Sequence, residues 1–92
     1  MTHPFEPNWT LRPGVHLTEI LHERRMPWEE AAVICGFAGV EEIEEIASGQ
    51  VKISPETAEQ LSKLGPSAQY WLNLQNNHDK ALARGAVDVS DD

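Results

Sequence analysis

The sequence is poor in the features that mark membrane proteins and disulfide-bonded secreted proteins. Its 92 residues include one cysteine, so no disulfide can form within the chain, and a reducing compartment is expected. No apolar run approaches the length of a membrane span, and the first residues lack the basic start and apolar stretch of a signal peptide. These absences predict a soluble cytoplasmic protein that does not contact a membrane.

Groupings of residues that carry out catalysis are also missing. The four histidines do not have the spacing of metal ligands, and no Ser-His-Asp or Cys-His arrangement and no glycine-rich phosphate loop can be placed. Cys35 lies in an apolar run and is interpreted as a small buried side chain. Carboxylates are plentiful, but on exposed helix faces they lack the burial that tunes a catalytic acid. The sequence therefore predicts no enzyme, no metal site, no cofactor and no small-molecule substrate.

Basic residues are scarce as well. Seven lysines and arginines stand against fifteen aspartates and glutamates, which gives a net charge of −8. Domains that bind nucleic acid usually carry the opposite sign, because lysine and arginine neutralise phosphates. Any contact with DNA must therefore rely on a few local cations.

What the sequence does contain is one domain of regularly spaced helices. Apolar residues recur three and four positions apart in segments that proline and glycine separate, at 15–25, 28–35, 40–48, 55–64 and 68–83. Ser54 before Pro55 is typical of a helix start, and Ser67 is expected to cap the last helix. With no strand pattern in the middle of the chain, the sequence predicts an all-α fold.

The two ends of the chain have a different character from the helical part. We divide the sequence into an irregular, proline-containing N-terminal arm (1–13), a helical domain (14–85) and an acidic C-terminal tail (86–92). The run AVDV in the tail could add a short strand, but we expect the tail mostly to fray.

The second and third expected helices have the lengths and the short glycine-containing link of a helix-turn-helix. In that motif the second helix lies in the major groove of DNA. Many helical hairpins share this spacing, so the motif alone is a moderate signal.

Motifs on either side make the identification more specific, because the chain resembles the HigA-type antitoxins of the XRE (lambda-repressor-like) helix-turn-helix superfamily. The matching residues are Pro13, Gly14, Leu17, Glu19 and Leu21, then Ile53, Ser54, Pro55, Ala58 and Leu61, and the string Trp71-Leu72-Asn73-Leu74-Gln75. The resemblance extends from about Trp9 to the C-terminal helix. It implies a five-helix lambda-repressor-like domain, usually dimeric, that silences a small ribonuclease toxin and represses its own operon through its third helix.

The third helix departs from this family in its charge. One side of it is apolar, and glutamates cover the remaining arc, where relatives carry neutral polar residues or arginine. The family's polar start of the second helix is replaced by Pro27-Trp28, and the turn around Gly39 has one extra residue. The candidates for contact with DNA or a partner are Trp28, Glu41, Glu42, Glu44, Glu45, Ser48, Gln50 and Lys52, with Arg24 and Arg25 as phosphate contacts. One glutamate can read cytosine, but four within five residues predict weakened operator binding.

Two groups of apolar residues are candidates for contact with a second copy or another protein. The fifth helix carries more aromatic and aliphatic side chains than one buried stripe needs, and the second helix carries two where relatives are polar. The candidates are Val33, Ile34, Tyr70, Trp71 and Leu74. Among the residues of the fifth helix, we expect Trp71 and Leu72 to lie toward the core and Tyr70 and Leu74 nearer a dimer seam.

The leading interpretation is a HigA-like antitoxin that forms a homodimer and neutralises a basic ribonuclease toxin by protein–protein binding. The resemblance implies duplex DNA as a second partner, with autorepression, and the glutamates predict that this binding is weak. Other interpretations stay open. The chain could be a stand-alone dimeric repressor or an acidic decoy that occupies the DNA groove of another regulator, or the glutamates could form a solvated face without a function.

Overall fold

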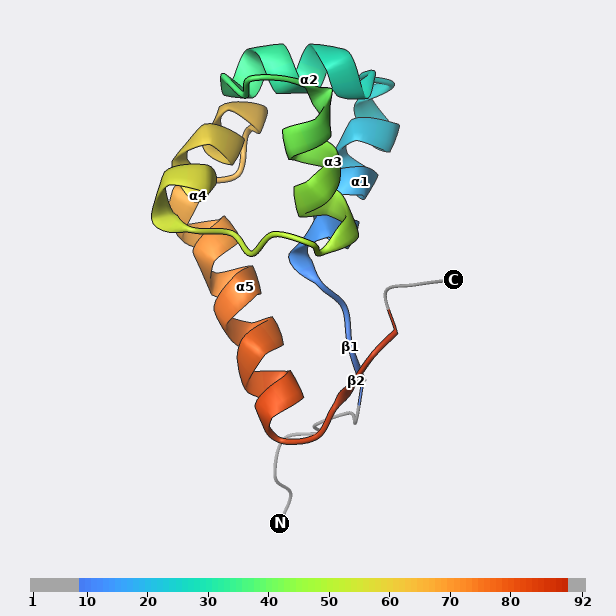
Figure 1. Cartoon of the computed structure of the whole chain (residues 1–92), viewed down its shortest axis with the longest axis vertical. Helices are drawn as coiled ribbons and strands as arrows, with labels where there is room; N and C mark the ends of the chain where they lie inside the picture. Colours follow the sequence, from blue (N-terminus) through green and yellow to red (C-terminus); the bar gives the residue numbers. More distant parts are fainter. Residues whose placement is uncertain (1–8, 90–92) are drawn as a thin grey trace.

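Five α-helices follow one another within residues 9–89, which are the residues that the structure, a computed structural model, describes (Figure 1). Their bounds are α1 Pro13–Arg24, α2 Trp28–Cys35, α3 Val40–Ser48, α4 Pro55–Leu61 and α5 Ala68–Ala83. The predicted all-α helix-turn-helix class is therefore confirmed. A 3-10 turn, η1 (Ser62–Leu64), replaces the last turn that we expected in α4. No helix in the described range is long and apolar enough to cross a membrane.

The ends of the helices follow local signals in the sequence. The Ser54 hydroxyl accepts a hydrogen bond from the Thr57 N–H at 3.2 Å, and the Ser67 hydroxyl accepts one from the Tyr70 N–H at the same distance. Both predicted serine caps are thereby confirmed. At the other end, Gly49 closes α3 with φ at 86°, a left-handed conformation that a glycine adopts without steric cost.

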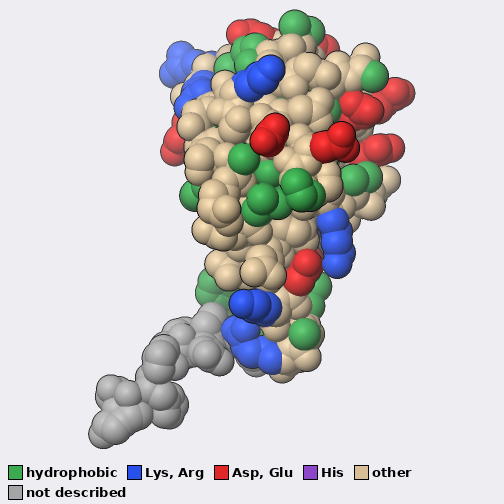
Figure 2. Space-filling view, turned by 90° about the vertical axis from the view of Figure 1, so that its left-hand side faces the viewer, with side chains coloured by type: hydrophobic (Ala, Val, Ile, Leu, Met, Phe, Trp, Pro, Cys, Tyr) green, Lys and Arg blue, Asp and Glu red, His purple; other side chains and the backbone are tan. Residues whose placement is uncertain are grey.

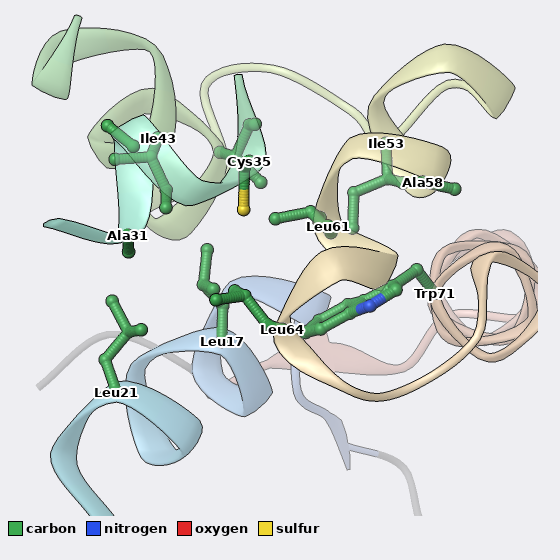
Figure 3. Packing of buried hydrophobic residues seen from close by; sticks show 12 residues of the cluster. Leu17, Leu21, Ala31, Cys35, Ile43, Ile53, Ala58, Leu61, Leu64 and Trp71 are labelled. Atoms are coloured by element: carbon green, nitrogen blue, oxygen red, sulfur yellow. The ribbon is translucent and has the colours of Figure 1, made fainter. Parts of the chain in front are cut away.

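The core lies where α1, α3, α4 and α5 converge, and α2 covers it at the top of Figure 1. Trp71 is fully buried, and its indole lies beside Leu64 and Leu17 in the close-up view of Figure 3. Cys35 is buried in the same cluster, as predicted. Burial raises the pKa of its thiol, and the charge of Lys63 offsets part of that rise. The thiol is thus a packing group and not a nucleophile.

The two ends of the described chain meet in a short parallel sheet, which differs from the irregular arm and mostly frayed tail that we expected. Strand β1 (Trp9–Thr10) pairs with β2 (Val87–Asp88), and the Val89 N–H donates to the Thr10 carbonyl at 3.0 Å. The pairing forms because α5 carries the chain back beside its own start, as Figure 1 shows. Residues 1–8 and 90–92, which complete the predicted arm and tail, lie outside the described residues.

Candidate nucleic-acid and partner interface

The helix pair α2–α3 presents α3 with its apolar side inward and its acidic side outward. Ile43 and Ile46 are buried, and the four glutamates between positions 41 and 45 are all exposed. The separation of faces that helical periodicity predicted is therefore present. The outer face of α3 is acidic along most of its length.

None of these four glutamates forms an ion pair with another described residue. One of them has a local structural role, because the Glu42 carboxylate accepts the Ala38 N–H at 2.9 Å and so fixes the turn before α3. In Figure 2 acidic side chains gather along the right-hand edge of the upper half, whereas the lysines and arginines of that face lie apart from them. We call the unpaired group Glu41, Glu44 and Glu45 the acidic face.

The last residue of α3 and the segment after it carry the DNA-compatible candidates Ser48, Gln50 and Lys52, and all three are exposed. Lys52 is engaged, because its ammonium lies 3.3 Å from a carboxylate oxygen of Asp79 in α5. The Ser48 hydroxyl donates to the Glu45 carbonyl within the helix at 3.2 Å. The cationic character of this segment is therefore reduced by a neighbouring acid.

Gln75 fixes this segment to α5, a role that sequence reasoning missed. Its side-chain oxygen accepts the Ile53 N–H at 2.9 Å, and its side-chain nitrogen donates to Asp79 at 3.0 Å. Gln75 is buried, so it supplies the hydrogen bond that the Ile53 backbone would otherwise lack. It is the last residue of the family string, which marked it as characteristic but did not reveal this contact.

Two residues at the start of α1 position the end of α3. The Arg12 guanidinium donates from Nε to the Ala47 carbonyl at 3.0 Å. Gly14 is required because a side chain at that position would overlap the Ala47 carbonyl oxygen. The Pro-Gly motif that opens the family pattern thus allows α1 and α3 to approach closely. Sequence reasoning used Gly14 as a marker and missed Arg12.

The predicted phosphate contacts lie at the opposite end of α1. Arg24 and Arg25 are both exposed, and Arg25 ends the helix in a left-handed conformation with φ at 53°. Arg25 and Trp28 line an open groove between α1 and α2 of about 610 Å³. Trp28 is only half-exposed, because part of its side chain packs against the core.

The apolar partner candidates separate into exposed and buried groups. Val33 is 78% exposed, Ile34 is 37% exposed and Tyr70 is 40% exposed, while Leu74 packs partly against the core. Trp71 is fully buried and cannot contact a partner, so its assignment as an interface candidate was wrong. Part of the Tyr70 ring is nevertheless covered, because it meets His16 and Trp71 edge-on. Within residues 9–89 no group of three His, Cys, Asp or Glu side chains could hold a metal ion.

Comparison with known proteins gives several similarities that extend over most of the chain. The chain is 38% identical over 80 residues to the HTH-type transcriptional regulator YddM of Escherichia coli K12, a match that covers 86% of this chain and 84% of the relative. A Nostoc punctiforme protein described as an antidote of a plasmid maintenance system has a TM-score of 0.76 and 30% identity over 83% of this chain and 84% of its own. The antitoxin HigA of Pseudomonas aeruginosa, solved with the higBA promoter, has a TM-score of 0.72 and 30% identity over 82% and 83%. No family model matches the chain.

Proposed function

The chain belongs to the HigA-type antitoxins, a family of helix-turn-helix transcriptional regulators, and on this basis we propose that it acts mainly by binding a protein and only weakly by binding operator DNA. Members of this family are regulators and not enzymes. The observation that carries the proposal is the acidic face, on the helix that a helix-turn-helix protein presents to the major groove.

The acidic face would meet phosphates unfavourably. Glu41, Glu44 and Glu45 form no ion pair within residues 9–89, and Lys52, which follows α3, already pairs with Asp79. Binding to DNA gains affinity when lysine and arginine release the counterions of the phosphates, and carboxylates supply no such gain. The repulsion acts at short range, since salt screens charges over about 8 Å at physiological ionic strength. If α3 entered the major groove, its whole outer side would lie within this distance of the phosphates.

The same charges favour a basic protein. A ribonuclease must hold RNA phosphates and therefore carries a cationic surface, which is complementary to the acidic face. We propose such a toxin as the partner, blocked sterically and electrostatically in the cytoplasm. A basic DNA-binding regulator carries a similar charge. The decoy interpretation therefore predicts that the same glutamates contact the partner, but that the partner is a regulator and not a toxin.

A growth-rescue experiment tests this proposal. A short reading frame beside this gene that encodes a basic protein would be expressed alone, where it should stop growth, and together with this chain, where growth should return. The triple variant Glu41→Gln, Glu44→Gln, Glu45→Gln should lose rescue and bind the toxin at least tenfold more weakly, because the charge complementarity is gone. Glu42 is left unchanged because it bonds to the Ala38 N–H.

The matched control removes the same charge elsewhere. Glu19→Gln, Glu23→Gln, Glu59→Gln changes three exposed acids on α1 and α4, so it should keep rescue. Both variants should melt at the temperature of the parent. Equal loss of rescue in the two variants would show that net charge matters and the acidic face does not. Full rescue by the first variant would exclude the acidic face as the docking surface.

Operator binding is the second candidate function, and the HigA structure with its promoter favours it. In this chain the contacts would come from Ser48, Gln50 and Lys52, with Arg24 and Arg25 on phosphates. A stand-alone repressor would use the same surface without a toxin. We propose that this binding is weak and falls steeply with salt, because few cations supply it.

We also propose that the chain forms a homodimer. Tyr70 and Val33 leave apolar surface exposed, and helix-turn-helix regulators bind paired half-sites as symmetric dimers. Analytical ultracentrifugation at micromolar concentration should show a species of twice the 10.3 kDa chain mass. A single monomeric species across the concentration range would contradict this.

A further inference from the structure

A cavity of about 270 Å³ separates the segment after α3 from α5. Its walls come from the start of α1, the end of α3 and the residues that follow it, the middle of α5, and β2. The Gln75–Ile53 hydrogen bond holds the segment beside α5 at this cavity. Ligand sites for drug-sized molecules have about 300–1,000 Å³, so this cavity suits a smaller metabolite.

Charges of both signs line the cavity. Its cations are Arg12 and Lys52, and its carboxylates are Asp79 and Asp88. Arg12 and Asp88 are engaged within the fold, whereas Lys52 and Asp79 pair with each other at the surface. The remaining wall is largely aliphatic, with Ile46, Val51 and Leu82 among its residues. A ligand with a single charge would meet a group of its own sign, whereas a ligand that carries both charges and an apolar part would match the wall.

A buried imidazole adds hydrogen-bonding capacity to the same cavity. His78 is only 8% exposed and lines the cavity, and its two ring nitrogens make only long contacts. Nδ1 lies 3.5 Å from the Thr10 hydroxyl, and Nε2 lies 3.6 Å from a carboxylate oxygen of Asp88. Good hydrogen bonds to nitrogen are 2.7–3.2 Å long, so the ring retains capacity for a closer partner.

One ion pair in the cavity wall can exchange its partners. The Lys52 ammonium lies 3.3 Å from a carboxylate oxygen of Asp79, and the Lys52 side chain is 76% exposed. Pairs this exposed contribute little to stability, so Lys52 can leave Asp79 at little cost, while Asp79 keeps its hydrogen bond from the Gln75 side chain. A zwitterion would replace this ion pair with two pairs, its carboxylate on Lys52 and its ammonium on Asp79. We infer that this cavity binds a small zwitterion, specifically an α-amino acid with an aliphatic side chain.

Such a ligand would act as an effector and not as a substrate. The cavity wall includes Ser48 and Lys52, which are candidates for contact with DNA, so occupancy would change how that segment is held. Ligand binding is measured without a toxin or DNA. Failure of this inference and failure of the proposed function are therefore separate results.

The first experiment measures thermal melting of the full chain with each of the twenty standard amino acids at about 10 mM, because a ligand that binds the folded state raises the melting temperature. Aliphatic amino acids should raise it and glycine should not. For leucine, calorimetry should then give a dissociation constant at least tenfold lower than for isocaproate, which lacks the ammonium, or for isoamylamine, which lacks the carboxylate.

The second experiment places the site. Lys52→Gln and Asp79→Asn should each weaken leucine binding at least tenfold, and Leu82→Trp should abolish it by filling the cavity. The matched controls, Lys80→Gln and Glu59→Gln, change exposed charges that do not line the cavity and should leave leucine binding unchanged. The inference is overturned if no amino acid raises the melting temperature, if either single-charge analogue binds as tightly as leucine, or if the controls weaken binding as much as the cavity variants.

Discussion

Helices α3 and α5 are both amphipathic, but they use their polar residues in opposite ways. α3 directs its charged residues outward, and three of its glutamates have no polar partner in the described part of the chain. α5 places Gln75 and His78 inside, where Gln75 bonds to the backbone of a distant segment and His78 contacts one residue of each terminal strand, Thr10 and Asp88. The buried Gln75 of α5 thus maintains the fold. The glutamates of the acidic face make no such hydrogen bond within residues 9–89, although Glu41 lies in the first turn of α3, where a carboxylate stabilises the helix. Binding is the role that we propose for this face.

The largest expected effect in this comparison comes from the buried side of α5. Trp71→Ala should lower the free energy of unfolding by about 3–5 kcal/mol, because it empties the largest fully buried site of the core. Chemical denaturation measures this loss. The indole N–H of Trp71 has no hydrogen-bond partner among the described residues, so Trp71→Phe, which keeps an aromatic ring, should cost much less. Equal losses in the two variants would mean that the ring does not fill the core as described.

A smaller effect is expected at the surface, where a single local bond holds a helix end. Ser54→Ala should lower the free energy of unfolding by about 1 kcal/mol, because the Thr57 N–H loses its acceptor. Ser48→Ala is the matched control, since that hydroxyl only donates to a carbonyl within its own helix. If Ser54→Ala melts at the parental temperature, α4 does not depend on this cap.

The sequence was sufficient wherever the determinants are local. The bounds of α2, α3 and α5 agree with the expected ranges because proline, glycine and serine act on the backbone within one or two turns. The parallel pairing of Trp9 with Val87 was not predictable, since it depends on where α5 returns the chain. Trp71 was partly misassigned for a related reason. A surplus of aromatic residues on one helix does not show which of them the other helices cover.

The candidate site shows the same division. Periodicity alone placed the glutamates on the outer side of α3. The ion pair of Lys52 with Asp79 joins residues 27 positions apart, and the hydrogen bond from the Ile53 N–H to Gln75 joins residues 22 positions apart. No sequence pattern marks such contacts. Motif resemblance identified Gln75 and Gly14 as characteristic of the family. Only the tertiary structure shows what these two residues do. Gln75 accepts a hydrogen bond from the segment after α3, and Gly14 allows the backbones of α1 and α3 to approach closely.

A fluorescence polarisation titration of the full chain against the DNA upstream of its gene, at about 150 mM salt, shows whether the acidic face prevents tight binding to DNA. We expect no sequence-specific binding in the submicromolar range. We also expect a gain in affinity when Glu41→Ser and Glu45→Arg are combined, because repulsion falls and one phosphate contact is added. Submicromolar, sequence-specific binding by the parent chain would contradict this expectation.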